Sequence, residues 1–232
     1  MNNRLINTKV AGGGGGCTDI VDNYDPFGGN GVALYQLNGN ALDSSPSANN
    51  GTLIGTGTYG TGVFGQAYVN NNTSAISCGS FGISGSSATF SASMWVKFDT
   101  LSFAQVFAMI TGSNTVNSTY ALSVNTSGNF YIDAYGHAYF FNNTPVVANQ
   151  WYHIVGVSNA SNHKLYINGS LAGEINQSLT FVSNFSAIGG RSIDNSTIYP
   201  DALRGSIDQV RIFNKALSAG EVTTLYNETP CN

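Results

Sequence analysis

NQWYHIVGVSNASNHKLYINGSLAG, residues 149–173, is the clearest structural signal in the chain. It holds two runs, 151–158 and 163–167, that are rich in aromatic and β-branched residues and have the length of β-strands. The dipeptide Asn168-Gly169 separates the second run from a further strand-like segment. Both of its residues tolerate a positive φ, which is typical of a tight hairpin turn. The stretch therefore predicts consecutive antiparallel strands.

The same pattern recurs along most of the chain. Short β-rich segments alternate with clusters of Gly, Asn and Ser, as in a β-sandwich or jelly roll. In one of them, Phe130 and Ile132 alternate with Tyr131 and Asp133, which is the period of a strand with two different faces. Strands are predicted near residues 32–37, 65–69, 75–78, 88–98, 104–111, 119–125, 129–134, 137–141, 151–158, 163–167, 171–175, 185–188 and 205–213.

The C-terminal end carries a helical signal. In KALSAGEVTTLYNE, residues 215–228, Ser218 and Glu221 have the spacing of a capping box at the start of a helix. Val222 and Leu225 follow at helical spacing. The sequence predicts an all-β sandwich of two antiparallel sheets with one short C-terminal helix packed on its edge.

Composition excludes several classes of partner. The chain is 42% hydrophobic and 12% aromatic, which is enough to build a core. Its net charge is −4 and it has only 8 Lys and Arg residues, too few to neutralise a phosphate backbone or bind an anionic membrane. No segment is as long and apolar as a membrane span or a secretory signal. Neither a nucleic acid nor a membrane is expected as a partner.

The N-terminal segment differs from the rest. Residues 1–30 lack strand periodicity and contain the run Gly12–Gly16, so we expect a flexible arm there and a single domain over residues 31–232. The glycine run is not a phosphate-binding loop. Such a loop ends in Gly-Lys followed by Ser or Thr, whereas here Cys17 follows the glycines.

Three cysteines leave two alternatives open. If the first and last strands lie side by side, a Cys17–Cys231 disulfide would join the two ends of the chain. Otherwise all three cysteines are free thiols. Cys78, which is flanked by small residues, is expected to be a buried thiol in either case.

Four motifs stand out: YQLNGNALDSSPSANNGTL (35–53), FSASMWVKFD (90–99), the stretch at 149–173, and GSIDQVRIFNKALSAGEV (205–222). Together they resemble the laminin G-like members of the concanavalin A-like lectin and glucanase superfamily. The resemblance covers roughly residues 31–228. It implies a jelly roll of two antiparallel sheets, one of them curved, with ligand sites on the concave face or at loop edges.

Catalysis is not expected. The glycan-cleaving relatives need two facing carboxyl groups, often in an E-x-D-x-E strand, and that motif is absent from this sequence. The chain also lacks a G-x-S-x-G nucleophile elbow. His137, His153 and His163 do not have the spacing of a metallohydrolase site. We therefore expect a protein that is not an enzyme.

Calcium is the cofactor that the resemblance favours. Asp43 matches an acidic loop position of the family and Asp208 matches the acidic residue of its last core strand. In relatives these regions can approach one ion, and carboxylates suit a hard cation. The alternative is that both carboxylates make local hydrogen bonds instead.

A saccharide site would use aromatic rings beside polar groups, and FYIDAYGHAYFFNN (130–143) is the densest patch of this kind. The candidate ligand-binding residues are Tyr131, Asp133, Tyr135, His137 and Tyr139, which would share a face if one strand ran through them. If the chain turns at Gly136 instead, the two arms pair and their aromatic residues become cross-strand neighbours.

Two functions follow as hypotheses. The leader and the segment CTDIVDNYDPFGGNGVALYQLNGN (17–40) make the chain similar to structural proteins of bacteriophage particles, particularly marine ones. This implies a virion protein, a capsid decoration or a tail or fibre component, held to other virion proteins through residues 1–30 and expected to be a homo-oligomer. The alternative is a lectin-like adhesion module that binds a bacterial surface glycan.

Overall fold

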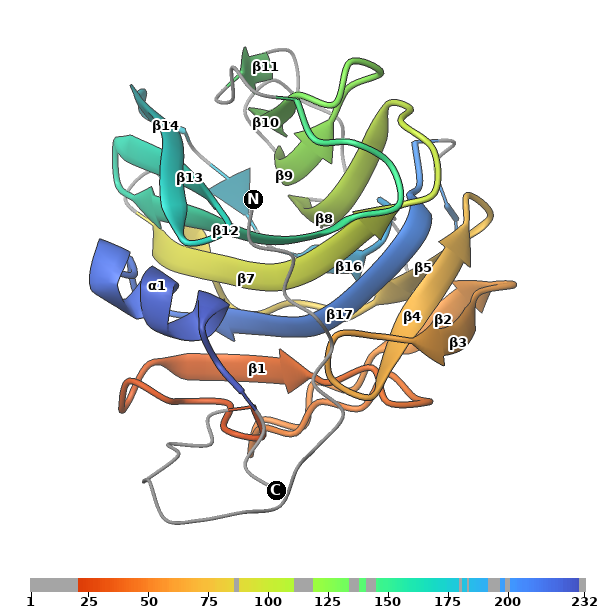
Figure 1. Cartoon of the computed structure of the whole chain (residues 1–232). Coiled ribbons are helices and arrows are strands. Elements are labelled where there is room, and N and C mark those ends of the chain that lie inside the picture. Colours follow the sequence, from red (N-terminus) through yellow and green to blue (C-terminus); the bar gives the residue numbers. More distant parts are fainter. Residues whose placement is uncertain are drawn as a thin grey trace, which may run out of the picture.

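The computed structural model describes residues 21–85, 88–110, 119–133, 138–140, 145–179, 181–182, 184–191, 197–198 and 201–229. These residues form two large antiparallel sheets, a two-stranded ribbon and one helix, α1 (Ala219–Tyr226). Figure 1 shows α1 on the outer side of one large sheet, the side that faces away from the other large sheet. The predicted all-β sandwich with a short C-terminal helix is confirmed. No helix among the described residues is long and apolar enough to cross a membrane.

The larger sheet has 8 strands in the order β14-β13-β12-β7-β17-β4-β3, and β1 also pairs with β17. The first half of β17 bonds to β4 and its second half to β1, so these two strands share one edge of it. The strands are β1 (Gly31–Tyr35), β3 (Thr58–Thr61), β4 (Gln66–Asn71), β7 (Thr89–Phe98), β12 (Trp151–Asn159), β13 (Asn162–Ile167), β14 (Ser170–Asn176) and β17 (Arg204–Phe213).

The smaller sheet has 7 strands in the order β11-β10-β9-β8-β16-β5-β2. Its strands are β2 (Thr52–Gly55), β5 (Ser74–Ser77), β8 (Ala104–Ile110), β9 (Thr119–Val124), β10 (Phe130–Asp133), β11 (Ala138–Phe140) and β16 (Phe185–Ile188). The ribbon consists of β6 (Ser84–Gly85) and β15 (Phe181–Val182).

Alternating side chains of both sheets meet in one core. On β7, for example, Phe90, Met94 and Phe98 point into it. The sheets approach closely at Gly156 of β12, where an added Cβ atom would lie 2.5 Å from Oη of Tyr120 on β9. A side chain at position 156 would therefore collide with the opposite sheet.

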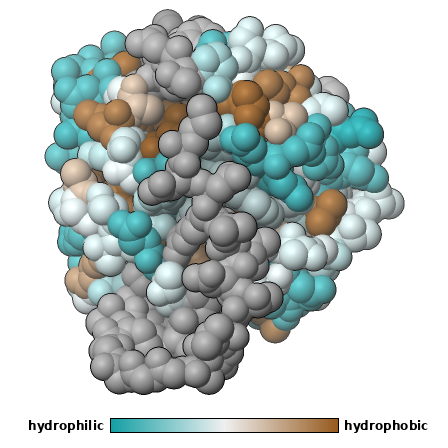
Figure 2. All heavy atoms as spheres, in the orientation of Figure 1, coloured by the Kyte–Doolittle hydropathy of each residue, from teal (hydrophilic) through white to brown (hydrophobic). Residues whose placement is uncertain are grey.

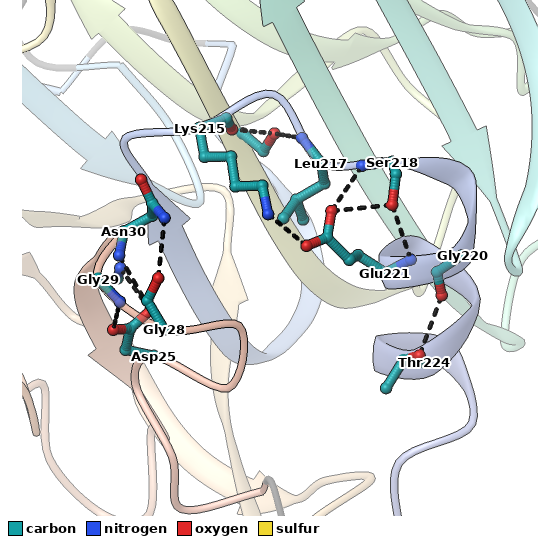
Figure 3. Close-up of polar contacts among 12 residues, drawn as sticks. Asp25, Gly28, Gly29, Asn30, Lys215, Leu217, Ser218, Gly220, Glu221 and Thr224 are labelled. Atoms are coloured by element: carbon teal, nitrogen blue, oxygen red, sulfur yellow. Dashed lines mark hydrogen bonds and ion pairs between the residues drawn. The ribbon is translucent and has the colours of Figure 1, made fainter.

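The helix begins as the sequence predicts. The Ser218 side chain accepts a hydrogen bond from the Glu221 backbone, and the Glu221 carboxylate accepts one from the Ser218 backbone at 2.8 Å, which completes the capping box (Figure 3). Val222 and Leu225 pack on the outer face of the larger sheet beside Phe213. Because this face is covered, the central strands of that sheet are buried on both sides.

The hairpin at Asn168-Gly169 is also confirmed. It joins β13 to β14, and both residues have positive φ values, 50° and 78°. Four short strands were not predicted: β2, β3, and the two strands of the ribbon, β6 and β15. β2 and β3 are exposed or half-buried and each contains a glycine, so neither shows an alternating apolar pattern.

Residues 21–30, the described part of the predicted arm, lie against the sandwich. Val21 is buried in a cluster with Phe64 and Trp95. The Asp25 carboxylate accepts hydrogen bonds from backbone amides of the loop that leads into β1, including that of Asn30 at 3.1 Å (Figure 3). The folded domain therefore starts before residue 31.

The visible surface is mixed in character. In Figure 2 hydrophilic and intermediate residues make up most of the coloured area, and hydrophobic residues occur in separate small groups. The exposed large hydrophobic side chains among the described residues are Leu42, Leu53, Phe103, Val147 and Leu171.

Candidate ligand-binding face of the smaller sheet

A row of polar side chains crosses the outer face of the seven-stranded sheet, the face that points away from the core. Gln105 on β8 is in register with Ser123 on β9, which is in register with Tyr131 on β10. The neighbours of these residues along the strands, such as Leu122 and Ile132, belong to the core. Because side chains alternate along a strand, the row lies on the opposite face.

A β-bulge places Gln105 in this row. The register of β8 against β9 shifts between Gln105 and Phe107, and both Val106 and Phe107 are core residues. The extra residue turns Gln105 outward, which is the usual effect of a bulge. Its backbone amide donates to the carbonyl oxygen of Asp201 at 2.8 Å, which holds Asp201 beside the row.

Two carboxyl groups and one guanidinium complete the polar cluster. Nε2 of Gln105 donates to Oδ2 of Asp133 at 3.2 Å. Nη2 of Arg191 lies 3.3 Å from Oδ2 of Asp201, and both side chains are mostly buried, with 13% and 12% of their surfaces exposed. We call Gln105, Ser123, Tyr131, Asp133, Arg191 and Asp201 the polar cluster.

Burial is the main cause of the pKa shifts of the acidic groups in the polar cluster. It raises the pKa of Asp133 above its ordinary value; Arg191 and the hydrogen bond from Gln105 oppose this rise, and Asp201 adds to it. Burial likewise raises the pKa of Asp201, opposed by Arg191. The pKa of Tyr131 is raised by burial and by the nearby Asp133, so its hydroxyl stays neutral at physiological pH.

An exposed aromatic ring borders the cluster. The ring of Phe103 lies 6.2 Å from that of Tyr131, centroid to centroid, and 45% of the Phe103 surface is exposed. Tyr131 is only 3% exposed. The site thus offers one accessible ring, supported by a buried one, next to buried polar groups.

Oε1 of Gln105, a buried polar atom of the cluster, has no protein partner. Gln105 is 1% exposed and its Oε1 receives no hydrogen bond. A buried acceptor of this kind costs folding free energy unless something donates to it. Thr119 on β9 lies on the same face, and its buried Oγ1 also lacks a partner.

The aromatic patch predicted from the sequence is only partly brought together. Antiparallel pairing of β10 and β11 puts Ile132 opposite Tyr139, so of the two alternatives left open by the sequence the structure shows the one in which the two arms pair. Asp133 and Tyr131 do lie in the cluster. Tyr135 and His137 lie outside the described residues.

Sequence reasoning missed Gln105, Ser123, Arg191 and Asp201. They come from four separate segments and match no motif. Only the β8–β9 register and the contact of Gln105 with Asp201 bring them together.

The two aspartates proposed for calcium bind separate parts of the backbone. Asp43 accepts from the amides of Leu34 and Asn49, both at 2.9 Å. Asp208 accepts from the amides of Val63 at 2.7 Å and Phe64 at 2.8 Å. The described residues contain no group of three or more His, Cys, Asp or Glu side chains placed to hold a metal ion.

Of the cysteines, Cys17 and Cys231 lie outside the described residues. Cys78 is a buried free thiol, as predicted, and burial raises its pKa to about 12. A thiol with so high a pKa is a poor nucleophile at neutral pH.

A pocket of about 560 Å³ lies elsewhere on the molecule, beside β2 and β5. Residues 48–50 and 77–80 line it together with Thr52. These residues supply amide and hydroxyl groups but no aromatic ring, so the pocket offers no surface on which a sugar ring could stack.

Comparisons with known proteins agree with the fold. A family model described as the concanavalin A-like lectin/glucanases superfamily matches residues 67–223. No curated protein gives a significant match. One similar solved structure is domain 4 of AbnA, a GH43 extracellular arabinanase from Geobacillus stearothermophilus, in complex with arabinotriose. Its TM-score with this chain is 0.69 at 23% sequence identity. The match covers 85% of this chain and 98% of the arabinanase domain.

Two toxin domains are similar over part of their length. The binding domain of botulinum neurotoxin serotype G has a TM-score of 0.62 at 19% sequence identity. The binding domain of Paraclostridial Mosquitocidal Protein 1 has a TM-score of 0.61, also at 19% sequence identity. Each is matched by 85% of this chain, which spans 50% and 52% of their respective lengths. The similarity at these identities is one of fold.

Proposed function

Because the chain belongs to the concanavalin A-like lectin/glucanases superfamily, we propose that it is a non-enzymatic binding module that holds a saccharide on the outer face of the smaller sheet. The observation that carries the proposal is the exposed Phe103 ring against Tyr131, beside the side chains of Gln105 and Asp133. An aromatic surface with a few directed polar groups is the usual composition of a small-molecule site.

The similar structures support a binding role by what their titles state. The arabinanase domain is in complex with arabinotriose, and both toxin domains are binding domains. Of the three, the arabinanase domain is covered almost completely by this chain. A saccharide ligand is therefore the favoured proposal over a protein receptor.

The use of the carboxylates supports a site without catalysis. A glycoside hydrolase needs two carboxyl groups on opposite sides of the scissile bond, one of them free to donate a proton. Of the glutamates, Glu221 caps α1, Glu228 is in a buried ion pair and Glu174 is in an exposed one. In the polar cluster Asp201 pairs with Arg191, and Asp133 accepts from Gln105.

A glycan array followed by titration calorimetry tests the proposal. We expect saturable binding to at least one oligosaccharide. Replacing Phe103 by Ala should weaken it by about tenfold, the size of effect typical of an aromatic anchor. Leu171→Ala is the matched control, because Leu171 is exposed to a similar extent, 51%, on the other sheet. Absence of binding to every glycan, or equal effects of both variants, would contradict the proposal.

A structural role in a virus particle is the second candidate. It rests first on the resemblance of residues 17–40 to structural proteins of bacteriophage particles. It rests also on the attachment of residues 21–30 to the sandwich, because this attachment would couple an anchored leader rigidly to the domain. Deletion of Met1 to Gly16 should then abolish incorporation into particles. Normal assembly of the truncated protein would rule out this anchor.

A calcium ion bound by Asp43 and Asp208 is likewise a proposal. Both residues offer carboxylate oxygens at fixed positions, although backbone amides already bind them. Calcium binding to the native state alone should raise the melting temperature. A melting temperature that chelator leaves unchanged would count against the ion.

A further inference from the structure

The charge of the polar cluster points to the class of saccharide it takes. Two carboxyl groups, Asp133 and Asp201, surround a single guanidinium, that of Arg191. The Nη2 atom of Arg191 already binds Asp201 at 3.3 Å. The positive charge that would otherwise attract an acidic ligand is therefore neutralised within the protein, and a carboxyl group remains in excess.

The orientation of the Gln105 amide adds an independent requirement, namely that the ligand donate hydrogen bonds. Its Nε2 donates to Asp133, so the amide presents Oε1 as an acceptor, and this atom is buried without a protein partner. Thr119 presents a second buried oxygen on the same face. A ligand that donates hydrogen bonds would satisfy Oε1, whereas a carboxylate or sulfate group can only accept.

We propose that the cluster binds neutral, hydroxyl-rich saccharides and discriminates against those that carry carboxylate or sulfate groups. This inference rests on the proposed saccharide site and names its substrate class. A sugar hydroxyl can donate to Gln105 Oε1 and to the carboxylates. A carboxylate or sulfate in place of the hydroxyl at this position would leave Oε1 unpaired and place like charges together in a partly desolvated site, and both effects weaken binding.

The pairing of Asp201 with Arg191 makes Asp201 the residue that sets this preference. Asp201→Asn would remove one carboxylate and release the guanidinium to bind an anion. The variant should therefore bind acidic saccharides better, although it adds no new group to the site. Glu174→Gln is the matched control, because it also turns a carboxylate into an amide but lies on β14 of the other sheet.

The experiment uses the full chain and pairs of oligosaccharides that differ only in bearing a hydroxyl or a carboxylate at C6, such as galactotriose and trigalacturonic acid. An array of neutral and acidic glycans first selects the pair, and calorimetry then measures each affinity. We expect the neutral member to bind at least tenfold more tightly. Asp201→Asn should reduce this ratio at least threefold, and Glu174→Gln should leave it unchanged.

Each other result has a distinct meaning. Equal or tighter binding of the acidic member overturns the neutral preference while the saccharide site stands. No binding to any glycan overturns the site itself, and the inference with it. An unchanged ratio in a folded Asp201→Asn protein, checked by its melting temperature, overturns the role of Asp201. If that variant does not fold, the wild-type comparison of the two probes still decides the preference.

Discussion

Arg211 connects three parts of the chain through one buried side chain. Its Nη2 lies 3.0 Å from the Glu228 carboxylate, and both side chains are 1% exposed. The same guanidinium donates to the carbonyl oxygens of Val21 at 2.9 Å and Asn23 at 3.2 Å. A buried ion pair of this kind is costly to break, because the remaining charge has no partner and no water.

Replacing Arg211 by Met should lower the free energy of unfolding by about 3–5 kcal/mol, since the buried Glu228 carboxylate would lose its guanidinium partner. Urea denaturation measures the change. Lys164→Met is the control, because the Lys164–Glu174 pair is exposed, at 35% and 48%, and such pairs contribute only about 0–1 kcal/mol. Similar losses in both variants would show that Arg211 contributes no more than a surface charge.

Asp208 should make stability depend on pH. Burial is the main cause that raises its pKa, from 3.8 to about 7, and the negative charge of Glu228 adds to it. The folded state therefore holds a proton that the unfolded state releases at lower pH. The contribution of Asp208 to stability is most favourable below about pH 4 and declines as the pH rises to about 7.

The variant Asp208→Asn tests this dependence. Its amide oxygen can still accept from the backbone amides of Val63 and Phe64, but it does not titrate. We expect the variant to gain stability relative to the wild type as the pH increases from 4 to 7, measured as urea midpoints. If the urea midpoints of the variant and the wild type differ by the same amount from pH 4 to 7, the raised pKa of Asp208 is contradicted.

Two glycines, one in a strand and one in the helix, show how packing determines which side chain a position can accept. Gly156 of β12 faces the opposite sheet, and a Cβ there would lie 2.5 Å from Tyr120 and 2.7 Å from Leu122. In contrast, Gly220 stands in α1, and a Cβ there would meet no atom within 4 Å. The same substitution should therefore have opposite effects at the two sites.

Gly156→Ala should destabilise the protein by about 1–3 kcal/mol, the usual effect of forcing an extra methyl group into a packed core. Gly220→Ala should stabilise it by about 0.5–1 kcal/mol, because alanine loses less backbone entropy in a helix. Thermal and urea unfolding of the two variants measure both effects. Stabilisation by Gly156→Ala would mean that the sheets are farther apart than the Tyr120 contact implies.

At the scale of the whole molecule, the two ends of the described chain meet at Arg211. Val21 and Glu228 both contact it, and they are separated by nearly the full sequence. Cys17 precedes Val21 by four residues and Cys231 follows Glu228 by three. Because the described ends next to these cysteines converge, we infer that a Cys17–Cys231 disulfide is favoured over the alternative of three free thiols.

Peptide mapping under non-reducing conditions tests this bond in protein prepared without reductant. We expect a cross-linked pair of terminal peptides. Replacing both residues by Ser should then lower the melting temperature, because a loop of more than 200 residues would no longer be closed in the unfolded chain, a loss of about 5 kcal/mol in the entropic account. Cys78 serves as an internal control, since a buried thiol should be labelled only after unfolding. Two free terminal thiols would exclude the bond.

The main features of the fold could be predicted because their signals are local in the sequence. The Asn168-Gly169 turn, the capping box at Ser218 and the alternation around Ile132 each depend on residues close in the chain, and the structure confirms all three. The exposed strands β2 and β3 escaped prediction because pairing with neighbouring strands, and not their own pattern, makes them strands.

Only the tertiary structure decided which residues form the candidate site. Gln105 faces outward because of a bulge, and Arg191 and Asp201 reach it through backbone contacts between distant segments. The hairpin of β10 and β11 likewise broke up the aromatic patch that reads as continuous in the sequence. A strand pattern specifies two faces, but strand register and the packing of other segments determine which side chains meet on each face.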